Sequence, residues 1–269
     1  MAGTTSSDYQ YINIPSSRIP SFDIYSAGFK KHHVTALLEF DVTDSRKRIR
    51  EKRRGGARLS FNAWLIKVIS DSLEKHPDAA AFKINKRKLI RFHDINISML
   101  VEKDLGEKKV PIPMVIEKCN EKSAEEITHE IESAKSQVMM DEDIVLRKKA
   151  TRLENLYYKL PGFARRWTWD YMLNNPRFAY KKMGNVVITS LGMTDKINGW
   201  FIHRSIHPVS FGIGSVIKKP VVIKDEIMVR EILNMTILMD HDVIDGAPMV
   251  RFVGELRRGI ERVGKPGIS

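Results

Sequence analysis

A histidine at the end of a strand-like run is the residue in this sequence best placed to do chemistry. The run 235–239 ends at Asp240-His241, and Asp245-Gly246 follow four residues later. A neutral imidazole titrates near pH 6.5, so it can take a proton from a thiol or a hydroxyl near neutrality. Four residues of extended backbone span roughly 13 Å. We therefore expect Asp245 to brace the turn at Gly246 rather than to contact the imidazole of His241.

Two histidine pairs and the single cysteine are weaker candidates. His32-His33 and the pair His203 and His207 could suggest a metal, but no carboxylate or cysteine completes a ligand set, so we expect no metal. Cys119 lacks a supporting motif for a nucleophile and is better explained as a buried structural residue. One cysteine cannot form an internal disulfide, which favours a reducing, cytoplasmic location.

Charge and composition narrow the possible partners. The 269 residues carry a net charge of +12, which favours an anionic partner: nucleic acid, an acidic membrane surface or a phosphorylated cofactor. The basic segment 46–54 has no interleaved aromatic residues to stack on bases, so a solvated helix face is the better explanation and no nucleic acid is expected. No apolar run approaches the roughly 18 residues of a membrane span. The first residues lack the pattern of a signal peptide.

The elements that must position His241 are a mixture of strands and helices. Thr43 or Asp44 would cap a helix at 46–54, and Ser60 would cap a helix at 61–75. A capping box at 123–126 predicts a helix that runs to about residue 138. Helix-like residues follow Gly246, and a closing helix is expected at 255–263. Strands are expected at 33–42, 88–92, 95–101, 110–116 (with prolines typical of an edge or a bulge), 185–191, 210–216, 220–223 and 226–231, with a charged loop at 102–109.

Two segments differ in character from the rest of the chain. Residues 1–30 are polar and irregular, and we expect an extended arm that lies on the domain or on a neighbouring subunit. Residues 139–183 are dense in aromatic and basic side chains. An additional helical subdomain with a small core of its own is the favoured interpretation of this segment. The alternative is a lid or a membrane-surface element near a site.

The sequence DHDVIDG around His241 resembles the D-H-x-x-x-D-G signature of the catalytic domain of dihydrolipoyl acyltransferases. These are the acyl-transferring components of 2-oxoacid dehydrogenase complexes, and chloramphenicol acetyltransferase shares their fold and signature. Residues 187–192 resemble the family's T-I-S-N-L-G strand. The similarity covers about 31–138 and 184–263, in order. Further matches lie at 33–35, 40–43, 110–116, 122–127, 211–214 and 219–222.

This resemblance implies the fold and the division of the chain. The expected fold is a two-layer α/β (α+β) sandwich, in which a mixed β-sheet packs against helices as in chloramphenicol acetyltransferase. After the arm 1–30, residues 31–269 would form the acyltransferase catalytic domain. The aromatic and basic segment at about 139–183 would be an insertion into it.

The resemblance also implies the chemistry. The family transfers an acyl group between coenzyme A, or acyl-CoA, and a thiol or hydroxyl acceptor. By motif position His241 is the general base, Thr189 is the hydroxyl that stabilises the tetrahedral oxyanion, and Asp245 holds the turn. Ser190 and Gly192 are the candidates for contacts with coenzyme A.

In the family the histidine and the hydroxyl come from two different chains. The resemblance therefore implies a homotrimer as the smallest active unit, which larger shells of trimers can extend. Arg18 is the candidate for the arginine that pairs with the carboxylate at Asp245.

Three functions are consistent with these features. A free-standing CoA-dependent acyltransferase with a small-molecule or carrier-bound acceptor is the leading hypothesis. It is favoured because neither a lipoyl domain with its attachment site nor a subunit-binding domain is recognisable on this chain. The first alternative is the acyltransferase core of a 2-oxoacid dehydrogenase complex that acts on dihydrolipoyl groups carried by a separate chain. The second is a non-catalytic trimeric binding or scaffold protein.

Overall fold

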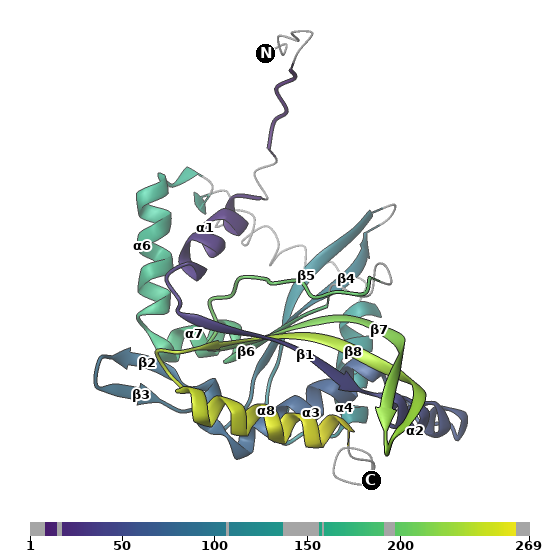
Figure 1. Ribbon diagram of the computed structural model, residues 1–269. Helices are drawn as coiled ribbons and strands as arrows, with labels where there is room; N and C mark the ends of the chain where they lie inside the picture. The colour runs from purple at the N-terminus through teal and green to yellow at the C-terminus, as the bar shows by residue number, and fades with distance from the viewer. Residues whose placement is uncertain are drawn as a thin grey trace.

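A six-stranded mixed β-sheet forms the centre of the protein (Figure 1). The computed structural model describes residues 9–14, 18–105, 108–136, 156–157, 159–190 and 197–261. The strand order is β1-β8-β7-β6-β4-β5, in which β6 is parallel to both of its neighbours and the other pairs are antiparallel. The strands are β1 (His33–Asp41), β4 (Ile97–Leu105), β5 (Lys108–Ile116), β6 (Val186–Ser190), β7 (Val209–Ile223) and β8 (Glu226–Asp240), and a separate hairpin pairs β2 (Phe82–Asn85) with β3 (Lys88–Ile90).

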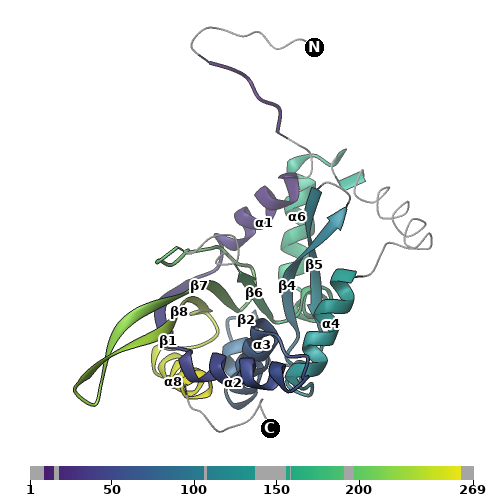
Figure 2. The same cartoon turned by 90° about the vertical axis from the view of Figure 1, so that its right-hand side faces the viewer.

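Helices cover one face of the sheet and make the second layer of a two-layer sandwich (Figure 2). The core between the layers contains Phe40, Phe211 and Phe252, which are all buried, and the rings of the last two meet edge to face at 6.4 Å. The expected α/β fold is therefore confirmed. The covering helices are α2 (Thr43–Arg54), α3 (Phe61–Lys75), α4 (Ala124–Ser136) and α8 (Gly246–Glu261), while α1 (Ile19–Gly28), α6 (Gly162–Leu173) and α7 (Pro176–Met183) lie at one end of the sheet.

Two of the three expected side-chain caps were predicted correctly from local sequence. The third is wrong, because α2 already includes Thr43 and Asp44 and its N-cap residue is Val42, with no side-chain cap. The Ser60 hydroxyl accepts a hydrogen bond from the backbone of Ala63 at 3.1 Å, and α3 has the predicted bounds. The capping box before α4 is also formed. Ser123 Oγ accepts from the Glu126 backbone at 3.1 Å, and the Glu126 carboxylate accepts from the Ser123 backbone at 2.6 Å. Such caps satisfy backbone donors locally, so they can be recognised without knowledge of the tertiary structure.

Strand bounds were predicted less well. The charged loop expected at 102–109 is wrong, because β4 extends to Leu105 and β5 begins at Lys108. The short strands expected at 210–223 are a single strand, β7, and those expected at 226–240 are a single strand, β8. Lys224 and Asp225 join the two through a two-residue turn with φ of 51° and 65°. That geometry is the hairpin turn that matches the twist of the strands, although glycine or asparagine usually provides it.

Two further expectations are corrected by the helices. α8 begins at Gly246, so the closing helix is much longer than 255–263. The arm expected at 1–30 is not extended throughout, because residues 19–28 form α1. Pro20 lies in the first turn of α1, where a missing backbone N–H costs nothing and the fixed φ favours a helix start. β5 is an edge strand, as its prolines indicated.

The segment expected to be an insertion is helical in its described part. α6 and α7 lie there, as predicted, but no residue of α6 is fully buried, so a separate small core is not formed by it. α6 packs on α1, and α7 packs on β2. The remaining residues of 139–183 lie outside the described part of the chain.

Candidate active site

His241 lies in a tight turn that follows β8 and precedes α8. Its backbone N–H donates to the carbonyl of His32 at 2.9 Å. The N–H groups of Val243 and Ile244 donate to the carbonyl of Asp240 at 3.0 and 3.2 Å. These bonds fix the backbone of the turn while the imidazole of His241 remains 50% exposed. The side chain is thus available to a substrate from outside the chain.

The expectation that Asp245 could not approach His241 is wrong. It assumed extended backbone, whereas the chain turns directly after β8, and Nδ1 of His241 lies 3.9 Å from a carboxylate oxygen of Asp245. That distance is too long for a hydrogen bond. The Asp245 carboxylate is 88% exposed, so water screens its effect on the imidazole.

The ion pair expected between Arg18 and Asp245 is not formed within the described chain. Arg18 is the N-cap residue of α1, and its guanidinium carbon lies 5.7 Å from the centre of the Phe22 ring. This contact keeps the Arg18 side chain on its own helix. Arg18 is therefore not the residue that holds the carboxylate of Asp245 in this chain.

A set of ion pairs that the sequence did not reveal holds the turn on both sides. Lys31 Nζ lies 2.8 Å from the buried carboxylate of Asp240. The carboxylate of Asp242 lies 3.1 Å from His32 Nδ1 and 2.7 Å from Lys83 Nζ. The hydrogen bond from Lys83, aided by His32, lowers the pKa of Asp242. His241 is thus flanked by two aspartates that are each anchored to a different part of the chain.

Thr189 lies on β6 within a row that crosses three strands. It pairs with Gly212 of β7, which pairs with Thr236 of β8. The ring of His203 occupies the space above Gly212, since a Cβ there would lie 2.9 Å from its Nδ1. His203 Nε2 is hydrogen-bonded to the Ser210 hydroxyl. The side chain of Thr189 is half-buried.

Thr189 and His241 of one chain are too far apart to act together. His241 is five residues beyond Thr236, the β8 residue in line with Thr189, which is roughly 17 Å along the strand. The two residues are also separated by two strand spacings, or about 10 Å. Ser190 follows Thr189 at the end of β6, and Gly192 lies outside the described residues.

Three buried or half-buried histidines near the start of β7 have structural roles. Burial lowers the pKa of His207 to about 4, and its Nε2 donates to the carbonyl of Met183 at 2.9 Å. His33 donates from Nε2 to the carbonyl of His207 at 2.9 Å, and burial also lowers the pKa values of His33 and His203. Among the described residues, no three histidine, cysteine or acidic side chains are grouped as metal ligands would be.

Cys119 is buried, as predicted. Burial raises the pKa of its thiol to about 12, and Sγ donates to the carbonyl of Ile116 at 3.3 Å. A thiol with such a pKa is not ionised near neutrality and is a poor nucleophile. Cys119 is therefore a core residue.

An open cleft of about 510 Å³ adjoins the turn that carries His241. Asp242 forms one wall, and the β2–β3 hairpin forms the others. Lys86, Arg87 and Lys88 have exposed side chains and no carboxylate partner among the described residues. The cleft is therefore a basic surface next to the candidate base.

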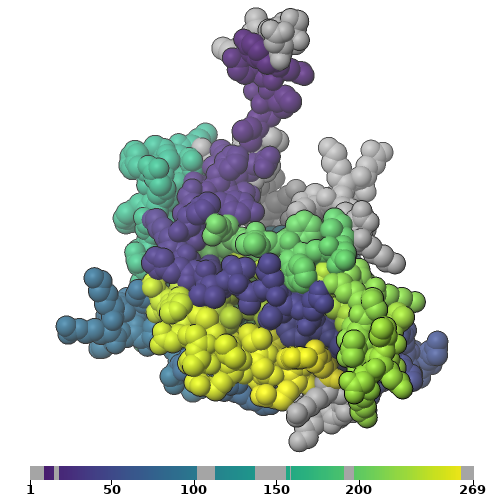
Figure 3. Space-filling model, viewed as in Figure 1, coloured from purple at the N-terminus to yellow at the C-terminus, as the bar shows by residue number. Residues whose placement is uncertain are grey.

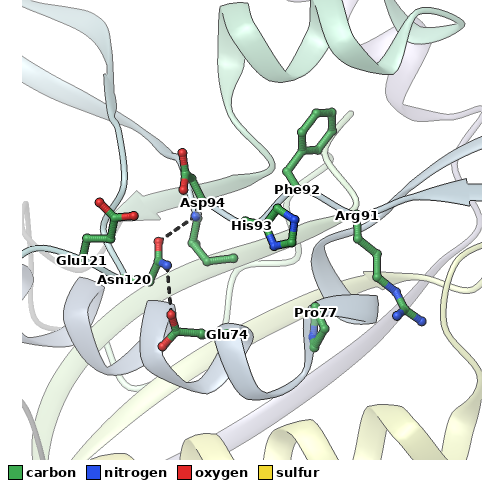
Figure 4. A pocket seen from close by; sticks show the side chains of 9 residues that line it. Glu74, Pro77, Arg91, Phe92, His93, Asp94, Asn120 and Glu121 are labelled. Carbon is green, nitrogen blue, oxygen red and sulfur yellow. Dashed lines mark hydrogen bonds between the residues drawn. The ribbon is translucent and has the colours of Figure 1, made fainter.

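A second cavity, of about 420 Å³, lies away from these residues, beside the C-terminal half of α3 (Figure 4). Asn120, one of the residues that line it, donates to Glu74 at 3.0 Å and accepts from the backbone of Ile95 at 2.9 Å. These polar groups satisfy one another and connect α3 to the segment before β4. We assign them a structural role.

Comparison with known families identifies the family to which this domain belongs. The family model of the 2-oxoacid dehydrogenases acyltransferase (catalytic domain) matches residues 25–142 and 181–266. The chain belongs to this family. The unmatched residues between the two ranges fall within the segment for which we expect an insertion. None of the helices in the described ranges is long and apolar enough to cross a membrane.

Relatives of this acyltransferase domain are components of dehydrogenase complexes. The lipoamide acyltransferase component of the branched-chain alpha-keto acid dehydrogenase complex of Bacillus subtilis is 25% identical over 237 residues, which cover 86% of this chain and 47% of the relative. The dihydrolipoyllysine-residue acetyltransferase component of the pyruvate dehydrogenase complex of Rickettsia typhi is 25% identical over 207 residues, which cover 76% of this chain and 41% of the relative. The chain thus spans less than half the length of these relatives.

Solved structures show the same fold. A probable dihydrolipoamide acetyltransferase from Listeria monocytogenes has a TM-score of 0.65 at 20% identity, and the match covers 95% of both chains. The dihydrolipoamide acetyltransferase of Azotobacter vinelandii also has a TM-score of 0.65 at 20% identity, over 94% of this chain and 93% of the other.

Proposed function

We propose that this domain transfers acyl groups between coenzyme A and a thiol or hydroxyl acceptor, with His241 as general base and Thr189 of a neighbouring subunit as oxyanion donor. The spacing of these residues carries the proposal. A serine, a histidine and an asparagine were investigated for their roles in the mechanism of the Azotobacter vinelandii enzyme. They are separated by the same 52 and four positions as Thr189, His241 and Asp245.

The geometry of the turn supports a role as base for His241. Its Nδ1 faces Asp245, so Nε2 is free to take the proton of the acceptor. The acceptor sulfur or oxygen then attacks the thioester carbonyl carbon, and the Thr189 hydroxyl donates to the resulting oxyanion. When the C–S bond breaks, the imidazolium returns the proton to the thiolate of coenzyme A. Protons and electron pairs balance without a further reactant.

The separation of Thr189 from His241 supports an active site shared between chains. A trimer would bring the turn of one subunit to β6 of the next, because closed cyclic assemblies repeat one head-to-tail contact. The cubic core of a pyruvate dehydrogenase complex shares the fold, with a TM-score of 0.64 at 20% identity. Beyond the strand β1, the ends of β7 and β8 project as a two-stranded ribbon (Figure 1). Its exposed Val222, Ile227 and Val229 are candidates for the contact with a neighbour.

The decisive experiment is release of free coenzyme A from acyl-CoAs in the presence of candidate thiols and alcohols. Substitution His241→Ala should abolish this release by removing the base, with unchanged circular dichroism and assembly size. His129→Ala is the matched control, because His129 is exposed on α4 and should be dispensable. Equal turnover by His241→Ala and the wild type would contradict the proposed mechanism.

The basic cleft beside Asp242 is suited to the phosphates of coenzyme A. Replacing Lys86 and Arg87 by alanine should raise KM for acyl-CoA about tenfold and leave kcat nearly unchanged, because the lost contacts are remote from the reacting atoms. Steady-state kinetics at several salt concentrations would measure this effect. Alanines at Arg53 and Arg54, which are exposed at the end of α2, provide the control. An equal change in both double variants would assign the effect to net charge alone.

Two alternatives are distinguished by the same assays. An acyltransferase core that serves dihydrolipoyl groups of a separate chain would use free dihydrolipoamide and form a large shell, as its relatives' names suggest. A binding or scaffold protein would bind coenzyme A without turnover on any acceptor. The free-standing acyltransferase is favoured by the added helices α6 and α7, which pack on α1 and on β2.

A further inference from the structure

An exposed row of aromatic rings runs along α6 and continues onto α7. Phe163, Trp167 and Tyr171 recur every four residues, so they share one face of α6, and their side chains are 69%, 70% and 54% exposed. The rings of Trp167 and Tyr171 are 6.1 Å apart, and Phe178 of α7 lies 6.3 Å beyond Tyr171. We call these four residues the aromatic ladder. A continuous exposed apolar surface of this kind usually marks an interaction site.

The opposite face of α6 is firmly attached to the protein. Asp23 of α1 accepts hydrogen bonds from Arg165 Nε at 2.9 Å and from the Tyr157 hydroxyl at 2.5 Å. Trp169 Nε1 donates to the same Tyr157 hydroxyl at 3.0 Å. Lys30 pairs with Asp170. The ladder is therefore presented to solvent by a helix whose inner face is already engaged, and α6 stands at the edge of the molecule (Figure 3).

The charge around the ladder selects an anionic partner. Residues 162–183 contain five basic residues and one acid, Asp170, which is already paired with Lys30. Arg166, Arg177, Lys181 and Lys182 are exposed. A second copy of this face would bring the same local excess of bases, so self-association through it would be opposed by like charges. Helices with Trp and Phe on one face and bases beside it bind anionic lipid surfaces.

We propose that the aromatic ladder and its flanking bases bind the surface of an anionic lipid bilayer, with α6 lying in the interface. This binding does not depend on the proposed catalysis. It would, however, place the candidate base at the membrane. Lys30 pairs with Asp170 of α6, and the next residue, Lys31, pairs with Asp240 directly before His241. An acyl acceptor or acyl chain dissolved in the bilayer would then reach the site from this end.

Sedimentation with vesicles tests the proposal. Wild-type protein should bind vesicles made of two parts phosphatidylcholine to one part phosphatidylglycerol. It should bind more weakly to vesicles of phosphatidylcholine alone, and its binding to the anionic vesicles should weaken in high salt. The double variant Trp167→Ala/Tyr171→Ala should bind at least about tenfold more weakly, because two aromatic anchors are lost. Arg166→Gln/Arg177→Gln should weaken binding to the anionic vesicles alone. Val250→Ala on α8, which is 72% exposed, is the control and should bind as the wild type does.

Three results would overturn the proposal. The first is the absence of wild-type binding, or equal binding by the aromatic double variant when circular dichroism shows that it is folded. The second is a change of oligomeric state in the aromatic variant, which would show that a second copy covers the ladder. The third is release from vesicles by single-stranded oligonucleotides that bind through the same side chains, which would assign the face to nucleic acid. Acyl transfer in detergent-free solution should persist in the ladder variants, so failure here is distinct from failure of the acyltransferase assignment.

Discussion

Lys31 is the residue whose loss should most affect the geometry of the His241 turn. Its ammonium lies 2.8 Å from the carboxylate of Asp240, which is buried directly before His241. Substitution Lys31→Met would leave that carboxylate without its cation, and we expect a loss of about 2–3 kcal/mol in the free energy of unfolding. Thermal unfolding would measure this as a drop in Tm of about 5–10 °C.

Lys122→Met provides the comparison for Lys31→Met. Lys122 pairs with Glu130 at 2.6 Å, but both side chains are partly exposed, so its removal should change the free energy of unfolding by less than about 1 kcal/mol. Equal destabilisation by the two substitutions would show that the buried pair at Asp240 has no special role. A fall in kcat that exceeds the loss of folded protein would identify Lys31 as a positioning residue for His241.

The residues of the candidate site differ in how well they could be found from sequence. His241 and Thr189 were indicated by short motifs, because each chemical group lies within a recognisable local pattern. Lys31 and Lys83 could not be found, because they reach Asp240 and Asp242 across 209 and 159 positions of sequence. Pairing over such distances depends on the register of β1 with β8 and on the position of the hairpin, which no local pattern contains.

At the scale of elements, the buried segment directly before β7 should make the stability of the protein sensitive to mild acid. The pKa of His207 is lowered by burial from 6.5 to about 4, so between these values the unfolded chain binds a proton that the folded chain does not. Stability should therefore fall as pH decreases from 6.5 to 4, by about 3 kcal/mol from His207 alone, and be fully present above pH 6.5. His33 and His203, whose pKa values are also lowered, act in the same direction.

Urea unfolding at a series of pH values would measure this dependence. His207→Gln retains a donor for the carbonyl of Met183 and removes the titrating group. The free energy of unfolding of this variant should therefore depend less on pH between 6.5 and 4, even if the variant is less stable overall. His129→Gln, on the exposed face of α4, should retain the wild-type slope. An unchanged slope in His207→Gln would refute the role of this histidine.

Helices and strands whose ends are set by local sequence were predicted well. Those whose bounds depend on pairing with distant parts of the chain were not. α3 was predicted residue by residue because Ser60 caps it and its apolar positions repeat with the helical period. β7 was broken into two strands because Lys218, Lys219 and Pro220 resemble a turn. In the structure these residues pair with β8 beyond the last pair of β1 with β8, so they continue a strand instead of turning.

For the whole molecule, the strongest prediction is complementation between two inactive chains. His241→Ala lacks the base and Thr189→Ala retains it, so neither homotrimer should be active if both groups are essential. Mixed trimers formed from equal amounts should regain about a quarter of the wild-type activity, because each site needs its base from one kind of chain and its hydroxyl from the other. Unfolding and refolding the two variants together, followed by the assay of coenzyme A release, would measure this.

The same mixing experiment has its own control. Refolding each variant alone, or mixing the two without unfolding, should give no recovery if subunits do not exchange. Absence of activity in co-refolded trimers of normal size would show that the two groups do not form a shared site. The separation of Thr189 and His241 within the chain would then require another explanation.

The distance between Thr189 and His241 has a consequence for how such a protein behaves in a cell. If every active site forms only when two subunits associate, newly synthesised monomers are inactive. Catalysis then begins only when the protein concentration is high enough for assembly. Dilution below the dissociation constant of the assembly would lower the activity per milligram of protein, and a crowded surface that gathers copies would raise it. Expression level and location would then control the reaction without any dedicated regulator.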